Sequence, residues 1–211
     1  TANRATLGGM TGNNSCGSRS IRYGNMVHNV RVIEALLPDG TSATFGPLSA
    51  DNDLILGKAK SLVEQMLALG IREADEIDTR FPKLLRRVGG YNINELTLEN
   101  PNLARLLVGS EGTLAWFQRI HLDLSPIPAH RTLGVCHFPT FYQAMEATQQ
   151  LVRLDPSAVE LVDRTMIDLA REIPMFKSTV DQFVVGEPEA LLLVEFSGED
   201  QQTQLDNIQR L

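Results

Sequence analysis

The stretch Leu7-Gly8-Gly9-Met10-Thr11-Gly12-Asn13-Asn14-Ser15-Cys16-Gly17 decides how the rest of the chain is interpreted. Its glycines and its adjacent asparagines are poorly suited to the interior of a helix or strand. Glycine lets a backbone approach a ligand closely, and free N–H groups in such a loop can surround an anion. The stretch therefore predicts a loop that lies against a polar ligand such as a cofactor, with a glycine-rich surface turn as the alternative.

The common nucleotide-binding loops do not explain this stretch. The Walker pattern needs Gly-Lys-Ser or Gly-Lys-Thr, and the sequence has neither triplet. The dinucleotide fingerprint G-x-G-x-x-G is also absent, and no apolar strand precedes the glycines. Any cofactor bound here must therefore be held by another kind of loop.

A second stretch, Val108-Gly109-Ser110-Glu111-Gly112-Thr113-Leu114, follows a predicted short helix and leads into an apolar strand. Arg22-Tyr23-Gly24 and a strand that ends in Pro38-Asp39-Gly40 lie between the two stretches. In this order and spacing, the motifs resemble the FAD-binding domain of the vanillyl-alcohol-oxidase/PCMH flavoproteins. They look closest to the branch of D-lactate, glycolate and D-2-hydroxyglutarate dehydrogenases. The resemblance covers residues 1 to about 127 well and the remainder more loosely.

The resemblance implies an α+β fold in two parts. Residues 1–127 would be the second half of a PCMH-type FAD-binding domain, a mainly antiparallel sheet with helices. Residues 128–211 would begin a ferredoxin-like cap domain, as their alternating strands and helices also suggest. The implied activity is FAD-dependent oxidation of a D-2-hydroxy acid to the 2-oxo acid, with hydride transfer to the flavin. The alternatives are an FAD-dependent oxidase of another alcohol or a sugar, and a non-catalytic packing or interaction module.

The resemblance also implies which residues contact FAD. They are Gly8, Gly9, Met10, Asn13, Asn14 and Gly17 on the pyrophosphate and flavin side, then Arg22 and Tyr23, then Gly109, Ser110, Glu111, Gly112 and Thr113 near the adenosine. The backbone N–H groups of Gly8, Gly9 and Met10 are the expected phosphate donors.

Several of these assignments have structural alternatives. Asn14 would bond the ribityl chain or the ring, or only stabilise its own turn. Arg22 would orient the loop or neutralise phosphate, or form a structural salt bridge. Glu111 would bind ribose hydroxyls, or fix its loop by accepting backbone N–H groups. The catalytic base is not identifiable, and no metal-ligand spacing occurs.

Three other positions are open or depart from the family. Trp116 stands where the family usually has a small or aliphatic residue, and it would otherwise be a core residue. Cys16 is more simply a small packed side chain than a redox group. Tyr91-Asn92 resembles a Gly-Tyr-Asn/Asp segment of the family, and we assign it no role beyond packing.

Composition narrows the possible partners. The 211 residues carry a net charge of −7, which argues against nucleic acid. No apolar run approaches the ~20 residues of a membrane span, and no signal sequence opens the chain. Two cysteines cannot make a disulfide scaffold, so we expect reduced thiols and a cytoplasmic location. The expected partners are a small 2-hydroxy acid, an electron acceptor of unknown kind and the remainder of a larger flavoprotein. We expect an internal fragment that binds FAD weakly and has no activity alone.

Patterning predicts the elements. The first part begins with a hairpin of strands at 30–37 and 41–45, followed by a helix at 56–69 that Gly70 caps. A helical region at 73–87 is broken near Phe81, and Asn100 caps the next helix. A strand at 113–124 and a linker at 125–128 complete this part. In the second part the elements are strands at 131–138, 158–162 and 190–196, a helix opened by a Thr140–Gln143 capping box, a short helix at 165–171 and a last helix opened by Ser197 with Asp200.

Overall fold

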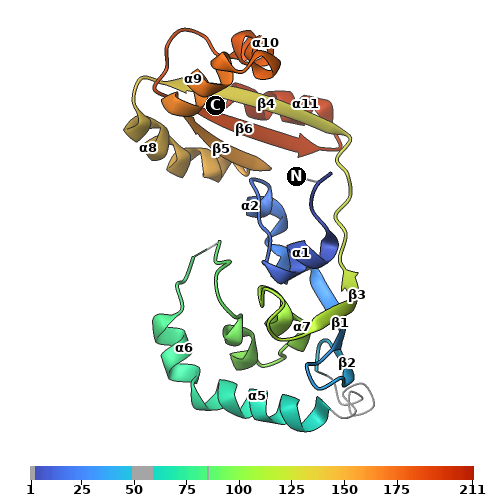
Figure 1. Ribbon diagram of the computed structural model, residues 1–211. Helices are drawn as coiled ribbons and strands as arrows, with labels where there is room; N and C mark the ends of the chain where they lie inside the picture. Colours follow the sequence, from blue (N-terminus) through green and yellow to red (C-terminus); the bar gives the residue numbers. More distant parts are fainter. Residues whose placement is uncertain (1–2, 49–58, 85) are drawn as a thin grey trace. The chain divides into compact units, whose positions relative to one another are not determined.

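The computed structural model describes residues 3–48, 59–84 and 86–211. The chain forms two compact units. The first unit contains residues 1–17 and 24–125, and the second contains residues 18–23 and 126–211. Both combine helices with an antiparallel sheet, as predicted (Figure 1).

The first unit is built on an antiparallel sheet with the strand order β2-β1-β3. Its strands are β1 (Val30–Leu36), β2 (Ser42–Phe45) and β3 (Trp116–Leu122). The predicted hairpin is confirmed, and its turn has Gly40 at φ 82°, a conformation that glycine adopts without steric cost. The third strand is shorter than predicted, because the residues before Trp116 belong to the turn-rich loop at 109–113.

Helices surround this sheet and its core. They are α1 (Leu7–Gly12), α3 (Met26–Asn29), α5 (Lys60–Arg72), α6 (Ala74–Arg80), η2 (Ile93–Thr97) and α7 (Leu103–Leu107). The inward residues of β1, Ile33 and Ala35, are fully buried. They belong to one cluster with Val63 of α5 and with Leu103 and Leu107 of α7. Helices α5 and α7 therefore cover this part of the sheet.

Gly70 does not cap the helix that contains it. The helix predicted to end at Gly70 continues to Arg72, and Glu73 is its C-cap. A Cβ on Gly70 would lie 2.6 Å from the Leu96 Cβ and 2.9 Å from the Leu96 backbone oxygen. The glycine is there because η2 packs against the helix backbone at this point. The predicted residues 56–58 lie outside the described part of the chain.

Two further boundaries differ from the prediction. Helix α6 ends at Arg80 with Phe81 as its C-cap, close to the expected break, but the described residues that follow Pro82 form no second helical piece. Helix α7 begins two residues late: its N-cap is Asn102, whose side chain accepts from the Ala104 N–H at 3.0 Å. Asn102 also donates to the Arg31 backbone oxygen at 3.0 Å, a contact with β1 that local patterning could not reveal.

The second unit has a three-stranded sheet with the order β4-β6-β5. The strands are β4 (His130–Phe138), β5 (Ala158–Asp163) and β6 (Ala190–Gly198). Since β6 runs antiparallel to both neighbours, β4 and β5 are parallel to one another, with α8 (Phe141–Leu151) between them in the chain. This is the split βαβ arrangement of ferredoxin-like folds.

Alternate residues of β6 face two different helix layers. Leu192, Val194 and Phe196 belong to a cluster with residues of α8 and with Ile208 of α11 (Gln201–Gln209). Leu191 packs with Ile167 of α9 (Arg164–Glu172) and Val180 of α10 (Pro174–Phe183). The short 3-10 turn η3 (Val152–Leu154) follows α8.

Helix caps in the second unit fit the sequence in part. The Thr140 hydroxyl accepts from the Gln143 N–H at 3.2 Å, which is one half of the predicted capping box. The Gln143 side chain accepts from the Thr140 hydroxyl at 3.1 Å instead of from the Thr140 N–H. The last helix is capped by Asp200 alone, whose carboxylate accepts from the Thr203 N–H at 2.8 Å. Ser197 is instead a buried residue of β6. Helix α10 was not predicted.

Candidate functional site: two glycine-rich loops

The first glycine-rich stretch is partly helical. The prediction of an unbroken loop is wrong, because Leu7–Gly12 forms α1. The Thr6 hydroxyl caps this helix by accepting from the Gly9 N–H at 3.1 Å, and the Thr11 hydroxyl donates to the Leu7 backbone oxygen at 2.9 Å. These two hydroxyls offset the low helix propensity of the glycines over little more than one turn.

The helix engages two of the three expected phosphate donors. Gly9 N–H is bonded to Thr6, and Met10 N–H donates to the Thr6 backbone oxygen at 2.9 Å. Gly8 lies in the first turn, where N–H groups have no acceptor in the helix itself. A Cβ on Gly8 would meet no atom within 4 Å, so its backbone is open to a ligand.

The residues after α1 form a tight turn. Asn13 is the C-cap, and its side chain accepts from the Ser15 hydroxyl at 2.6 Å. Asn14 has φ 50° and is fully buried. Its Oδ1 accepts from the Val27 N–H at 3.0 Å, which fixes the turn against α3. Because Asn14 is buried and bonded to backbone, the structure gives it the turn-stabilising role. Gly17, at the end of the stretch, is exposed.

The second stretch is a loop with an unusual backbone. Gly109, Glu111 and Gly112 have φ of 81°, 52° and 75°. Glu111 and Gly112 are exposed, and a Cβ on Gly112 would meet nothing within 4 Å. The Thr113 hydroxyl closes the loop by donating to the Ser110 backbone oxygen at 2.6 Å. The outer side of this loop is therefore open backbone, as a loop that contacts a cofactor requires.

The two stretches lie directly against one another, although about a hundred residues separate them in sequence. Gly109 N–H donates to the Thr11 backbone oxygen at 3.0 Å, and Glu111 N–H donates to the Gly12 backbone oxygen at 2.8 Å. A Cβ on Gly109 would lie 3.2 Å from the Asn14 Cβ, so only glycine allows this approach without displacement. The motifs predicted to share a ligand are thus one continuous surface of the first unit.

The surface also contains a polar atom that the described residues do not satisfy. Ser110 is 1% exposed, and its hydroxyl has no hydrogen-bond partner within the described residues. A buried polar group without a partner costs free energy unless a ligand or water completes it. Together with the open backbone at Gly8 and Gly112, this hydroxyl fits a ligand that is rich in hydrogen-bonding oxygens, as FAD is.

The predicted residues Arg22 and Tyr23 do not belong to the same unit as the two loops. Both belong to α2 (Ser20–Tyr23) in the second unit. The Arg22 Nη1 donates to the Ser157 hydroxyl and to the Ser197 backbone oxygen, each at 2.9 Å. Arg22 thus holds neutral groups of the second unit instead of the salt-bridge partner considered as its alternative role.

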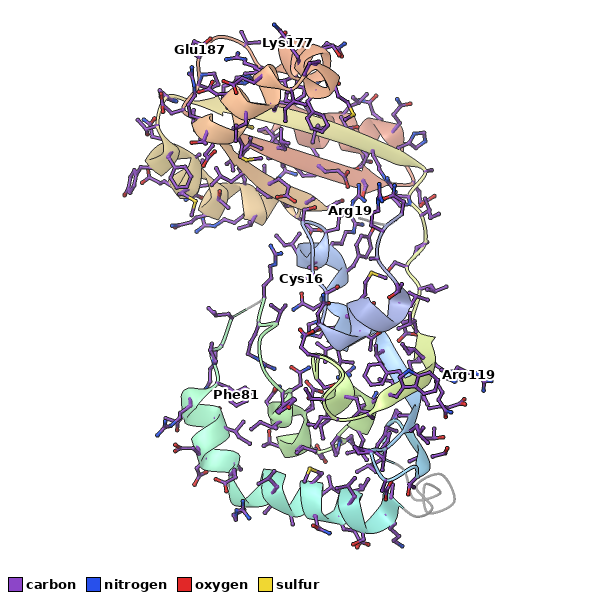
Figure 2. The ribbon with its side chains drawn as sticks, in the orientation of Figure 1. Cys16, Arg19, Phe81, Arg119, Lys177 and Glu187 are labelled. Atoms are coloured by element: carbon purple, nitrogen blue, oxygen red, sulfur yellow. The ribbon has the colours of Figure 1, made fainter. Side chains whose placement is uncertain are left out.

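Arg19, labelled in Figure 2, is also bound within the second unit. It makes a bidentate contact with Glu195 of β6, at 2.9 and 2.7 Å. The Arg19 hydrogen bond is the main reason why the pKa of Glu195 lies below its usual value, against an opposing effect of burial. The segment between the first cofactor stretch and α3 is therefore fixed to the second sheet by two arginines.

Two residues near the stretches are more exposed than expected. Cys16 is exposed instead of packed, and the Arg86 Nη2 donates to its sulfur at 3.2 Å (Figure 2). Trp116 is 66% exposed at the start of β3, so it is not a core residue. The Trp116 indole is available to a ligand or another segment.

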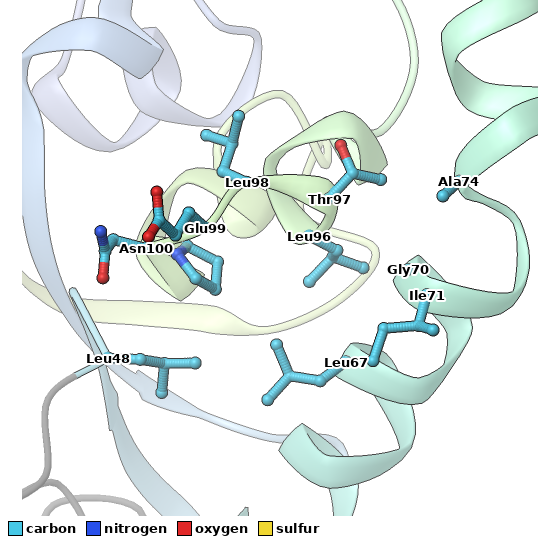
Figure 3. Close-up of a pocket in the computed structure, with 11 residues that line it drawn as sticks. Leu48, Leu67, Gly70, Ile71, Ala74, Leu96, Thr97, Leu98, Glu99 and Asn100 are labelled. Carbon is cyan, nitrogen blue, oxygen red and sulfur yellow. The ribbon is translucent and has the colours of Figure 1, made fainter.

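A hollow of about 490 Å³ lies elsewhere in the first unit (Figure 3). Leu67 and Ile71 of α5 line one side, and Leu96 and Leu98 lie opposite. It shares no lining residue with the two stretches, and its walls are mostly aliphatic. It lacks the convergent polar groups that orient a cofactor.

The described residues contain neither a metal-binding cluster nor a helix that could span a membrane. Among them, no group of three or more His, Cys, Asp or Glu side chains is placed to hold a metal ion. Within the same residues, no helix combines the length and the apolar character that crossing a bilayer requires.

Comparison with known families connects these two stretches to FAD. A model of the "FAD binding domain" matches residues 1–46, and a model of "FAD linked oxidases, C-terminal domain" matches residues 127–211. The first match contains the Gly8–Gly17 stretch, and the second contains all three strands of the second sheet. Together they cover more than half of the chain.

Curated relatives agree with the family models. The chain is 31% identical to a D-2-hydroxyglutarate dehydrogenase of Escherichia coli, over 95% of this chain and 21% of that protein. It is 32% identical to one of Pantoea ananatis, over 95% of this chain and 20% of that protein. It is 26% identical to a D-lactate dehydrogenase of Archaeoglobus fulgidus, over 95% of this chain and 34% of that protein. The chain thus spans between a fifth and a third of these relatives.

A solved structure shows the same fold. An alkyldihydroxyacetonephosphate synthase matches with a TM-score of 0.57 and 18% identity, over 98% of this chain and 33% of that one. The family models, the relatives and the fold agree with the motifs in the two stretches, and the chain belongs to the FAD-linked oxidases.

Proposed function

We propose that this chain supplies FAD-contacting loops and the start of a cap domain to an FAD-dependent dehydrogenase of D-2-hydroxy acids. The direct contact between the Gly8–Gly17 stretch and the Gly109–Thr113 loop carries the proposal, since it makes one open backbone surface from two family motifs. The relatives named D-2-hydroxyglutarate and D-lactate dehydrogenase support the substrate class.

FAD, when bound, supplies the redox chemistry by accepting a hydride from the substrate α-carbon. The chain's own residues bind and orient it. Gly8 N–H is the phosphate donor that α1 leaves open, and the hydroxyl of Ser110 donates to an oxygen of the cofactor. Glu111 and Gly112 present open backbone on the same side of the loop.

Other predicted residues hold the two stretches in shape and are not part of their open backbone surface. Asn13 and Asn14 fix the turn that follows α1, and Gly9 and Met10 provide the helix backbone that Thr6 caps. Thr113 closes the second loop. Direct cofactor contacts by Gly17, Arg22 and Tyr23 remain part of the proposal on the resemblance alone. The two unpaired cysteines support a cytoplasmic location.

The test uses the full-length natural protein. Purified protein should carry a flavin absorbance spectrum, and heat should release FAD. A panel of D-2-hydroxyglutarate, D-lactate, glycolate, a sugar and an aromatic alcohol is then added anaerobically, and bleaching of the flavin band is followed. Bleaching by a D-2-hydroxy acid and not by its L-enantiomer is expected. Bleaching by the sugar or the aromatic alcohol alone would refute the substrate class, and protein without flavin would refute the cofactor.

A further inference from the structure

The motif Gly89-Gly90-Tyr91-Asn92 has no part in the surface described above, yet it contacts the Gly109–Thr113 loop at both ends. Asn92 bonds the residue before the loop, and Tyr91 bonds the last residue of the loop. Gly90, with φ 76°, turns the chain so that these adjacent side chains reach opposite ends. Two adjacent residues, Tyr91 and Asn92, therefore bond the chain at the two ends of the loop.

Asn92 is the buried member of this pair of residues. It is 1% exposed. Its Nδ2 donates to the Val108 backbone oxygen at 2.8 Å and to the Arg105 backbone oxygen at 3.2 Å. Its Oδ1 accepts from the Arg87 Nη2 at 2.8 Å. Both sides of the amide are thus satisfied, and the amide orientation is fixed because carbonyls lie on one side and a cation on the other.

Arg87 contacts Asn94 and Phe81 as well as Asn92. The same Nη2 donates to Asn94 Oδ1 at 2.6 Å, and the guanidinium lies 4.9 Å from the centre of the Phe81 ring. Burial lowers the pKa of Arg87 from its usual value. A charged hydrogen bond to a buried amide is stronger than a neutral one, so Asn92 is held firmly.

Tyr91 is the exposed member of the pair. Its hydroxyl lies 2.8 Å from the Thr113 hydroxyl. Since the single Thr113 proton is donated to the Ser110 backbone oxygen at 2.6 Å, Tyr91 must donate and Thr113 accept. The two bonds form a chain from Tyr91 through Thr113 to Ser110. The backbone of Ser110, whose buried hydroxyl has no partner in the described chain, is therefore fixed from the outside.

We propose that Tyr91 and Asn92 are positioning residues that hold the Gly109–Thr113 loop in its FAD-binding conformation. The inference rests on the proposed function for the identity of the ligand. Glu111 has φ 52°, a conformation that is costly for a residue with a side chain, and the loop needs bonds at both ends to retain it. Without them, the Ser110 hydroxyl and the loop backbone no longer face one ligand together.

The experiment compares three variants of the full-length natural protein. Tyr91→Phe removes only a hydroxyl, and Asn92→Ala removes the buried amide. Asn102→Ala is the matched control, because Asn102 is also a buried amide bonded to backbone, but at the opposite end of α7 from the loop. Dissociation constants for FAD are measured with apoprotein, together with melting temperatures and the visible circular dichroism of the bound flavin.

Tyr91→Phe should weaken FAD binding about threefold to tenfold, and Asn92→Ala about tenfold to a hundredfold. The control should lower the melting temperature as Asn92→Ala does, while its FAD affinity stays within about twofold of wild type. Altered circular dichroism of the flavin in Tyr91→Phe, but not in the Asn102→Ala control, would support positioning. The Tyr91 hydroxyl is at the surface, so this variant is decisive even if Asn92→Ala does not fold.

Equal FAD affinity in Tyr91→Phe and wild type, with an unchanged flavin signal, would overturn the inference. So would an equal loss of affinity in the Asn102→Ala control, because the effect would then follow stability alone. Wild-type apoprotein that binds no FAD would instead refute the proposed function. The wild-type titration thus separates the two failures.

Discussion

Replacement of Gly70 by alanine should destabilise the protein, although the same change usually stabilises a helix. Gly70 lies inside α5, where alanine would contribute up to about 1 kcal/mol through helix propensity. However, the position that a Cβ on Gly70 would occupy lies against Leu96 of η2, and both residues line the hollow in Figure 3. The sign of the effect depends on which term is larger.

The geometry decides in favour of the steric term. An alanine Cβ would lie 2.6 Å from the Leu96 Cβ, 2.9 Å from its oxygen and 3.1 Å from its carbonyl carbon. Two of these atoms are backbone, so no rotamer change of Leu96 removes the clash. Overpacking costs about 1–3 kcal/mol, and contacts below 3.0 Å that include a backbone atom place this clash in the upper half of that range, at about 2–3 kcal/mol. After subtracting the helix term, we expect a net loss of about 1–2 kcal/mol, which corresponds to a melting temperature about 2–8 °C lower.

The assay is urea and thermal unfolding of the purified protein, followed by far-ultraviolet circular dichroism. Gly8→Ala is the matched control: it is also a helical glycine, but its Cβ would meet no atom within 4 Å. The control should be neutral or stabilising. A Gly70→Ala protein as stable as wild type, or more stable, would show that η2 does not pack against α5 as described.

Other predictions follow from single residues. In the full-length protein, Gly8→Val should abolish FAD binding with little change in far-ultraviolet circular dichroism, because its side chain would cover the open backbone; normal FAD content after purification would contradict this. Arg19→Met should raise the pKa of Glu195 toward its ordinary value, measured by NMR titration of the carboxylate. Because folding lowers this pKa, the stability from the pair is present above the unfolded-state pKa and lost as pH falls through the folded-state value; an unchanged pKa in the variant would exclude the pairing. Iodoacetamide should modify the exposed Cys16 before Cys136, whose pKa is raised by burial; mass spectrometry showing the reverse order would refute the burial assignment.

Local patterns predicted the strands well because each strand is an apolar run bounded by turn residues. Val30 to Leu36 carries its buried residues on the core side, and the turn at Pro38-Asp39-Gly40 needs only local chemistry. The three strands of the second unit were also predicted within a few residues. The link between the two glycine-rich stretches came from the family resemblance, since spacing alone does not reveal a contact across about a hundred residues.

Two of the errors share a physical cause, which is contact between segments distant in sequence. Gly70 has the pattern of a C-cap, but it is a glycine because Leu96 needs the space. Asn102 caps α7 in preference to Asn100 because it also bonds Arg31 on β1. The helix at Leu7–Gly12 depends on a local cap, Thr6, and here we gave the glycines too much weight.

The position of α2 has a consequence for dividing the protein. Residues 18–23 belong to the second unit, while the residues on both sides of them belong to the first. A protease cut near Pro126 would therefore leave a nicked molecule in which Arg19 and Arg22 still hold the second sheet. Truncation at the same point would separate those arginines from Glu195 and Ser157. A gene fragment that preserves the second unit must therefore contain the chain on both sides of the linker, from residue 18 to residue 211.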